Sequence, residues 1–235
     1  YLVRLLYPRS DRVICSSEHI KNEIIRLSKV RSARVEVLPN PIDIARIRAE
    51  AKALDGQRDL SSFSQYTIVA VGRLIRAKGF DVLIDALAIA RETEDIHLVI
   101  VGDGPERGSL EGKISDLGLS SSITLVGYQS NPYPYIANSD LFVLSSRWEG
   151  YVNVVIEAMV LGIDVVMTDC KSGPGNLLKN TLEYPLVPLE SPQALAQEIC
   201  RVLLNPRDTS MFDNLLEKHQ LPYAVSRYLG EEYEC

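Results

Sequence analysis

Short apolar runs alternate along most of the chain with longer stretches of helical periodicity. The apolar runs predict strands at residues 12–15, 34–38, 66–71, 97–101, 123–126, 141–144, 165–168 and 186–187. The periodic stretches predict helices at residues 17–28, 44–54, 79–91, 105–117, 153–161, 192–204 and 223–233. Strands alternating with helices in this way predict an α/β fold, a Rossmann-like doubly wound parallel sheet flanked by helices.

The chain also shows where its parts divide. Residues 55–65 are polar and rich in serine, which indicates a boundary before a compact unit running from residue 66 to about residue 205. Upstream, the two prolines of residues 38–43 predict an extended turn. Residues 1–7 are apolar and resemble the end of a helix whose earlier part is missing, so we expect that the chain begins inside a longer protein.

Composition and charge narrow the function. The balance of 46% apolar and 24% charged residues is that of an ordinary globular protein. The net charge of −6 provides no overall positive field for nucleic acid or an anionic bilayer, so any anion must bind at a local site. The four cysteines lack the paired spacings of metal sites, and we interpret them as reduced thiols of a cytoplasmic protein.

Three motifs follow the ends of predicted strands, at the edge where open α/β sheets bind ligands. In the first, residues 72–79 read Gly-Arg-Leu-Ile-Arg-Ala-Lys-Gly. Gly72 permits a close approach to the backbone, Arg73 can grip phosphate oxygens with paired donors, and Lys78 adds a point charge before a helix start. A diphosphate would suit this place, although a solvated loop explains the same cations equally well on spacing alone.

The second motif, Gly102-Asp-Gly-Pro105, is a glycine-rich turn before a helix that starts with proline. A plain connection between strand and helix is the simpler interpretation of it.

The third motif places Glu149 and Glu157 eight residues apart. If Asn153 caps the following helix, Glu149 lies in the loop before it and Glu157 in its second turn, and both carboxylates face one cleft. Gly150 frees the backbone to present the N–H groups of residues 151–154 to an anion. Without a further pattern, two solvated glutamates would remain the simpler interpretation.

Together, these stretches resemble the large family of retaining glycosyltransferases of GT-B architecture that carry a Glu-x7-Glu motif. The match runs from Asn40 to about Asn205, with five motifs in the family's order. They are Asn40-Pro-Ile-Asp43, Val71-Gly-Arg-Leu with Lys78-Gly-Phe-Asp81, Val101-Gly-Asp-Gly-Pro105, Leu125-Val-Gly-Tyr128 and Glu149-Gly-Tyr-Val-Asn-Val-Val-Ile-Glu-Ala-Met159. The fold implied by the resemblance is the C-terminal half of a GT-B enzyme.

The resemblance implies a hexosyltransferase that moves a sugar from a UDP- or GDP-sugar to an acceptor with retention of configuration. Arg73 and Lys78 would hold the diphosphate as it leaves. Glu149 would contact the transferred sugar and Glu157 the ribose hydroxyls. The family uses Arg, Lys and helix ends in place of a divalent ion, so neither a metal nor a prosthetic group is implied. The other binding residues implied by the match are Gly72, Gly102, Tyr128, Gly150, Tyr151, Val152, Asn153 and Val154.

By the same resemblance, residues 1–43 are the end of an N-terminal acceptor domain and the linker, residues 44–205 bind the nucleotide sugar, and residues 206–235 are helices that cross back. We therefore expect a donor-binding part that is inactive as an isolated fragment. Its carbohydrate or lipid-linked acceptor would bind through the missing domain, at the inner face of the membrane where the full-length protein makes a peripheral contact. No nucleic acid partner is expected. Residues 171–174, Lys-Ser-Gly-Pro, are similar to subgroups that assemble bacterial surface polysaccharides.

Some features depart from the family or stay open. Asp164 stands where the family usually has proline, and residues 177–188 lack a customary glycine pair, which puts nearby donor-sugar contacts in question. Trp148 either walls the cleft or packs. The three histidines lie outside the motifs, and we expect them to have no catalytic role. Two other functions stay open: a noncatalytic nucleotide-binding module, which the retained cations and glutamates argue against, and a nucleotide-sugar epimerase of the same architecture.

Overall fold

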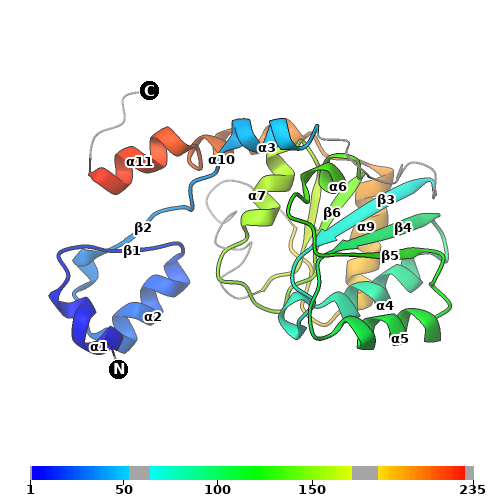
Figure 1. Cartoon of the computed structure of the whole chain (residues 1–235), viewed down its shortest axis with the longest axis horizontal. Coiled ribbons are helices and arrows are strands. Elements are labelled where there is room, and N and C mark those ends of the chain that lie inside the picture. Colours follow the sequence, from blue (N-terminus) through cyan, green and yellow to red (C-terminus); the bar gives the residue numbers. More distant parts are fainter. Residues whose placement is uncertain (1, 53–63, 171–184, 231–235) are drawn as a thin grey trace.

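The structure is a computed structural model that describes residues 2–52, 64–170 and 185–230. Its main body is built on a parallel sheet in the order β5-β4-β3-β6-β7 (Figure 1). The strands are β3 (Tyr66–Val71), β4 (Ile96–Val101), β5 (Ile123–Gly127), β6 (Leu141–Leu144) and β7 (Val165–Met167). The chain adds β4 and β5 on one side of β3 and then returns to add β6 and β7 on the other. The direction of winding therefore switches between β3 and β6, and ligands bind at such switch points in open α/β sheets.

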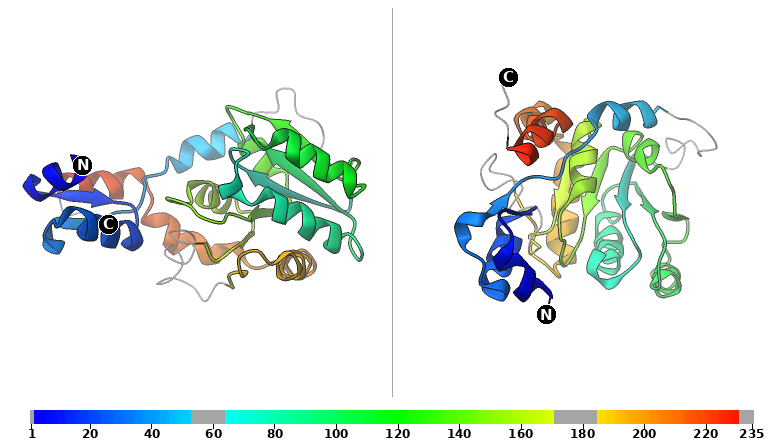
Figure 2. Two further views of the ribbon diagram at one scale, coloured as in Figure 1. Left: turned by 90° about the horizontal axis from the view of Figure 1, so that it is seen from below. Right: turned by 60° about the vertical axis from the view of Figure 1, so that its left-hand side comes forward.

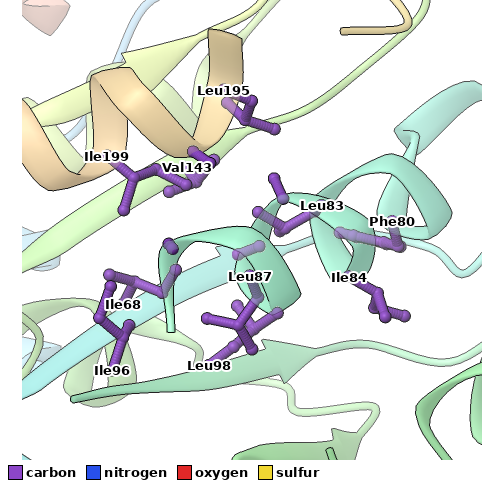
Figure 3. Close-up of a cluster of buried hydrophobic side chains, with 14 of the residues drawn as sticks. Ile68, Phe80, Leu83, Ile84, Leu87, Ile96, Leu98, Val143, Leu195 and Ile199 are labelled. Atoms are coloured by element: carbon purple, nitrogen blue, oxygen red, sulfur yellow. The ribbon is translucent and has the colours of Figure 1, made fainter. Parts of the chain in front are cut away.

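The strands are apolar because helices cover both faces of the sheet. Every residue of β4, β6 and β7 is buried. Figure 3 shows one face, where Leu87 lies near Leu98, Ile68 lies near Ile96 and Ile199 lies near Val143. The helices on this face are α4 (Phe80–Ala90), α5 (Arg107–Asp116) and α9 (Pro192–Leu204). The helices on the other face are α3 (Ile44–Glu50), α6 (Tyr133–Ala137), α7 (Asn153–Val160) and α10 (Asp213–Glu217).

A smaller unit lies beside the main body (Figures 1 and 2). Val13, Val30 and Val35 form its core, and Ile20 and Ile24 of its longer helix pack on them. Its elements are α1 (Leu2–Leu6), η1 (Tyr7–Arg9), β1 (Val13–Cys15), α2 (Glu18–Ser28), η2 (Ser32–Arg34) and β2 (Val35–Val37). The two strands pair in parallel.

Two segments cross between the small unit and the main body, and they lie side by side. The N–H of Ile42, in the first crossing, donates to the carbonyl of His219, in the second, at 2.7 Å. Beyond His219, α11 (Leu221–Leu229) extends toward the small unit (Figure 1). There Arg12 donates to the Arg227 and Tyr228 carbonyls at 2.7 and 2.8 Å, so α11 is tied to the start of β1.

The observed elements confirm the predicted fold class and most of the predicted strands and helices. The predicted strand at residues 186–187 reduces to a single bridge between Val187 and Thr168. The helix expected at residues 44–54 ends at Glu50, and its last two predicted residues lie outside the described part. Most of the polar boundary, residues 171–174 and the end of the last predicted helix also lie outside it. The short helices α6 and α10 were not predicted.

Candidate functional site

The loops that follow β3 and β6 meet at the switch point of the sheet. They are the β3–α4 loop, residues 72–79, which contains η4 (Arg76–Lys78), and the β6–α7 loop, residues 145–152. The hydroxyl of Ser145 donates to the Lys78 carbonyl at 2.8 Å, and the N–H of Arg147 donates to the Ala77 carbonyl at 2.7 Å. Gly79 has φ of +63°, and a Cβ there would lie 2.1 Å from the Ser145 carbonyl oxygen. This close approach requires glycine at position 79, and the two hydrogen bonds hold the loops together.

An ion pair lies where these loops meet. The Nζ atom of Lys78 is 2.7 Å from Oε1 of Glu149, and the Ser146 hydroxyl donates to the same oxygen at 2.6 Å. Only 19% of the Lys78 side chain and 11% of the Glu149 side chain are exposed. Because the surroundings are largely dry, the attraction is stronger than for a surface pair. The pair therefore fixes a cation and a carboxylate next to each other at the sheet's ligand edge.

A cleft of about 420 Å³ opens beside this pair, at the ends of β3, β4 and β5. Its volume suits a small-molecule ligand. Gly102 has φ of +144°, and a Cβ there would lie 1.9 Å from the Gly72 carbonyl oxygen, so the backbones of two loops that line the cleft are in close contact. The lining residues are Val71, Gly72, Arg73, Val101, Gly102, Asp103, Tyr128 and Gln129.

Lys78 connects the cleft with the ion pair. A Cβ on Gly72 would lie 3.0 Å from Cε of Lys78, so the lysine side chain passes directly over this glycine. Arg73, the next residue along the cleft wall, is exposed. The structure thus brings Gly72, Arg73, Lys78 and Glu149 into one continuous region, with Gly102 and the exposed Tyr128 on the cleft.

Glu157 has different neighbours. It lies in the second turn of α7 and is half-buried. Burial raises the pKa of its carboxyl above the ordinary value, while the charge of Arg46 on α3 opposes the rise. In the described part of the chain Glu157 forms no hydrogen bond or ion pair with Glu149 or the cleft residues. That both glutamates border one cleft therefore stays a prediction.

The start of α7 corrects one expectation. The helix begins at Asn153, as predicted, with Val152 at its N-cap position, so the condition that Asn153 caps the helix is not met. The side chain of Asn153 instead accepts a hydrogen bond from the Asn40 amide, in the first crossing, at 3.0 Å. Glu149 still lies in the preceding loop, as predicted. The first N–H groups of a helix have no partner within it, and those of Asn153 and Val154 form no hydrogen bond with the residues that the structure describes.

Two residues with long-range contacts were missed by the sequence analysis. His219 is buried and its Nε2 lies 2.7 Å from the hydroxyl of Tyr151 in the β6–α7 loop. Arg147, also in this loop, pairs with Asp81 and Glu190. No sequence signal marked either residue, because the partners lie far away along the chain. Arg147 and Tyr151, which make these contacts, each lie two residues from Glu149 in the sequence.

The other two histidines and Cys170 lie outside the cleft lining. His97 is buried and bonds to Thr124 at 2.8 Å, a packed residue as expected, and His19 is exposed. Cys170 is buried near Glu149; burial, reinforced by the charge of Glu149, raises the pKa of its thiol to about 12. The described residues include no cluster of His, Cys, Asp and Glu that could hold a metal ion. They also include no helix long and apolar enough to span a bilayer.

A doubly wound sheet with a lysine and a glutamate at its switch point and a glycine-lined cleft beside them is typical of α/β proteins that bind nucleotides. The family described as glycosyl transferases group 1 matches residues 65–205, more than half of the chain, and the family described as Glycosyltransferase Family 4 matches residues 1–46. The chain belongs to the group 1 glycosyl transferases.

Individual relatives agree with this assignment. The N-acetylgalactosamine-N,N'-diacetylbacillosaminyl-diphospho-undecaprenol 4-alpha-N-acetylgalactosaminyltransferase of Campylobacter jejuni is 31% identical over 214 residues, covering 91% of this chain and 56% of the relative. The lipopolysaccharide core biosynthesis glycosyltransferase LpsE of Rhizobium meliloti is 30% identical, covering 93% of this chain and 61% of the relative. The chain thus spans little more than half of these relatives.

Solved structures share the fold. Anabaena HepE in complex with UDP and glucose superposes with a TM-score of 0.83 at 22% identity, over 97% of this chain and 65% of that one. Staphylococcus aureus TarM, in a complex that includes UDP, superposes with a TM-score of 0.79 at 21% identity, over 98% of this chain and 45% of that one. At this identity the likeness establishes a common fold, that of GT-B glycosyltransferases.

Proposed function

We propose that this chain is the donor-binding part of a retaining glycosyltransferase that uses a UDP- or GDP-sugar. The observation that carries the proposal is the Lys78–Glu149 pair, held at the switch point beside a glycine-lined cleft of ligand size. A cation for phosphate and a carboxylate for sugar hydroxyls are then adjacent, as transfer from a nucleotide sugar requires.

The roles follow from charge. Phosphate charge grows as the glycosidic bond breaks, so Arg73 and Lys78 would stabilise the transition state more than the bound donor. Glu149 accepts hydrogen bonds from hydroxyls of the transferred sugar. When the diphosphate forms an ion pair with Lys78, the lysine interacts less strongly with Glu149, and the Glu149 carboxylate can accept hydrogen bonds from the sugar.

The base and the ribose of the donor have their own contacts in this proposal. Tyr128, which lines the cleft, contacts the base, and Glu157 holds the ribose hydroxyls. The backbone of residues 150–154 completes the cradle with N–H groups at the start of α7. No metal takes part in this scheme, because cations and helix N–H groups supply the positive charge.

The relatives indicate the donor and acceptor class. HepE and TarM were solved with UDP, which makes UDP the first nucleotide to test. The names of the Campylobacter and Rhizobium relatives refer to a diphospho-undecaprenol-linked saccharide and to the lipopolysaccharide core. We therefore propose a carbohydrate or lipid-linked acceptor in bacterial surface polysaccharide or glycolipid assembly, at the cytoplasmic face of the membrane.

The proposal also assigns a role to each of three parts of the chain. Residues 1–43 would belong to the acceptor domain and the linker, residues 44–205 to the donor domain, and residues 206–235 to the return crossing. Because the chain spans 56% and 61% of the two relatives, we expect it to bind donor without appreciable sugar transfer.

Calorimetric titration of the chain with UDP, GDP and ADP tests donor binding. We expect one of the diphosphates to bind clearly more tightly than the others, and absence of binding by all three would refute the proposal. Incubation with UDP-sugars, with and without acceptor, separates the alternatives. Efficient transfer by this chain alone would contradict its role as a part, and conversion of the sugar without acceptor would indicate an epimerase.

A further inference from the structure

We propose that Arg147, held by Asp81, is a positioning residue that sets the placement of Lys78 relative to Glu149. This inference rests on the proposed function, because it concerns how that site is built. Arg147 lies two residues before Glu149, yet its guanidinium bonds to the β3–α4 loop, the first turn of α4 and Glu190.

The contact with Asp81 is a two-pronged ion pair. Nη1 and Nη2 of Arg147 each donate to one carboxylate oxygen of Asp81 at 2.7 Å. Such paired bonds fix direction as well as distance. Only 13% of the Arg147 side chain is exposed, and the hydrogen bonds to Arg147 lower the pKa of Asp81, although burial opposes the shift.

The guanidinium uses all five of its donors. Besides Asp81, Nη1 donates to the Arg76 carbonyl at 2.9 Å, Nη2 donates to Glu190 at 3.0 Å, and Nε donates to the other oxygen of Glu190. Lysine has three donors and no planar fork, so it can retain the charge of Arg147 without its geometry.

These bonds hold the residues next to both partners of the Lys78–Glu149 ion pair. The main chain of Arg147 binds the Ala77 carbonyl and its side chain binds the Arg76 carbonyl, so the two residues before Lys78 are fixed to the residue two before Glu149. If the guanidinium is removed, Asp81 and Glu190 lose their shared cation, and the β6–α7 loop is held less firmly against the β3–α4 loop, by the Ser145 and main-chain hydrogen bonds and the Lys78–Glu149 pair. Lys78 and Glu149 then no longer converge on one ligand.

Trp148 provides a direct readout. It is the only tryptophan of the chain, it lies between Arg147 and Glu149, and it is 53% exposed. We would compare Arg147→Gln, Arg147→Lys and Asp81→Asn with Arg26→Gln, which removes one charge from an exposed pair on α2. Tryptophan emission and acrylamide quenching are measured on the free chain, with far-UV circular dichroism to verify folding.

We expect Arg147→Gln and Asp81→Asn to shift Trp148 emission and raise its quenching at least twofold, with Arg147→Lys intermediate and Arg26→Gln unchanged. In titrations, Arg147→Gln should weaken UDP-sugar binding about tenfold or more and leave uridine binding within about twofold. Should Arg147→Gln not fold, the lysine and Asp81→Asn variants carry the comparison.

A folded variant with wild-type Trp148 signals would overturn the proposal, as would a lower melting temperature with unchanged UDP-sugar affinity. The latter result would assign Arg147 a purely structural role. If the wild-type chain bound no nucleotide sugar, the proposed function would fail, while the fluorescence of the free chain would still decide whether Arg147 positions the loop.

Discussion

The hydroxyl of Tyr151 and Nε2 of His219 lie 2.7 Å apart, and this bond ties the loop that carries Glu149 to the segment that crosses back from the main body. Nδ1 of His219 lies 2.8 Å from the Leu215 carbonyl, so the imidazole donates a hydrogen bond to this carbonyl. Its Nε2 then accepts a hydrogen bond from the Tyr151 hydroxyl. The carbonyl of His219 also receives the N–H of Ile42. Both crossings and the β6–α7 loop therefore meet at one buried histidine.

Protonation of His219 should weaken the fold. Burial lowers the pKa of His219, as does the charge of Lys218, while the bond to Leu215 opposes the shift. An unfolded histidine titrates near pH 6.5, so below about that pH the unfolded state takes up a proton first and the free energy of unfolding falls. Above it, both states are neutral and this contribution is fully present. Urea unfolding of wild type and His219→Gln between pH 5 and 8 measures the difference.

We expect the wild type to lose more stability than His219→Gln as the pH falls from 7 to 5. Burial also lowers the pKa of His97. We therefore include His97→Gln for comparison and expect it to remove a separate part of the pH dependence of stability. Tyr151→Phe should cost about 1–2 kcal/mol at pH 7, since it removes one buried hydrogen bond. Parallel pH curves for wild type and His219→Gln would contradict this account.

The sheet and the position of the cleft could be predicted because they depend on local pattern. Apolar runs mark the strands, and the motifs after them lie at one edge once the strands are parallel. The side-chain network could not be predicted, since its bonds join residues far apart in sequence. Arg147 and Asp81 are separated by 66 positions, Tyr151 and His219 by 68. Periodicity carries no information about such pairs.

Asp164 illustrates the same limit. It departs from the family pattern, a departure that put the nearby donor-sugar contacts in question. In the structure its buried carboxylate accepts hydrogen bonds from the N–H and guanidinium of Arg207, 43 positions away, at 3.1 and 3.0 Å. The aspartate therefore anchors the segment after α9 to the start of β7, and its role is structural.

Removing this carboxylate should be costly. Asp164→Ala removes one of the two acidic partners that the largely buried Arg207 guanidinium has among the described residues, and we expect a loss of about 3 kcal/mol in the free energy of unfolding. Glu23→Ala breaks an exposed Arg26–Glu23 pair and should change stability by less than about 0.5 kcal/mol. Denaturant titration of the two variants measures the contrast, and similar losses would contradict the structural role of Asp164.

Replacement by alanine should have opposite effects on stability at two glycines. At Gly102 a Cβ would meet the Gly72 carbonyl at 1.9 Å on a backbone with φ of +144°, so Gly102→Ala should destabilise the fold and weaken nucleotide binding. Gly112 lies inside α5 with nothing within 4 Å of an added Cβ, so Gly112→Ala should stabilise the chain by about 0.5–1 kcal/mol. Thermal melts and UDP titrations of both variants check this, and equal behaviour would show that the loop contact is not tight.

The phosphate role of the two cations makes the sharpest prediction about binding. Lys78→Ala and Arg73→Ala should each weaken UDP binding by about 10- to 100-fold, as expected for loss of a charge-assisted hydrogen bond of about 1.5–3 kcal/mol. Neither change should alter uridine binding by more than about twofold, because the nucleoside carries no phosphate. Within the described part of the chain, Lys78→Ala also leaves the Glu149 carboxylate with Ser146 as its remaining partner, so the double variant Lys78→Ala with Glu149→Gln controls for that unpaired charge. If UDP and uridine lose affinity equally, the two cations do not bind the diphosphate.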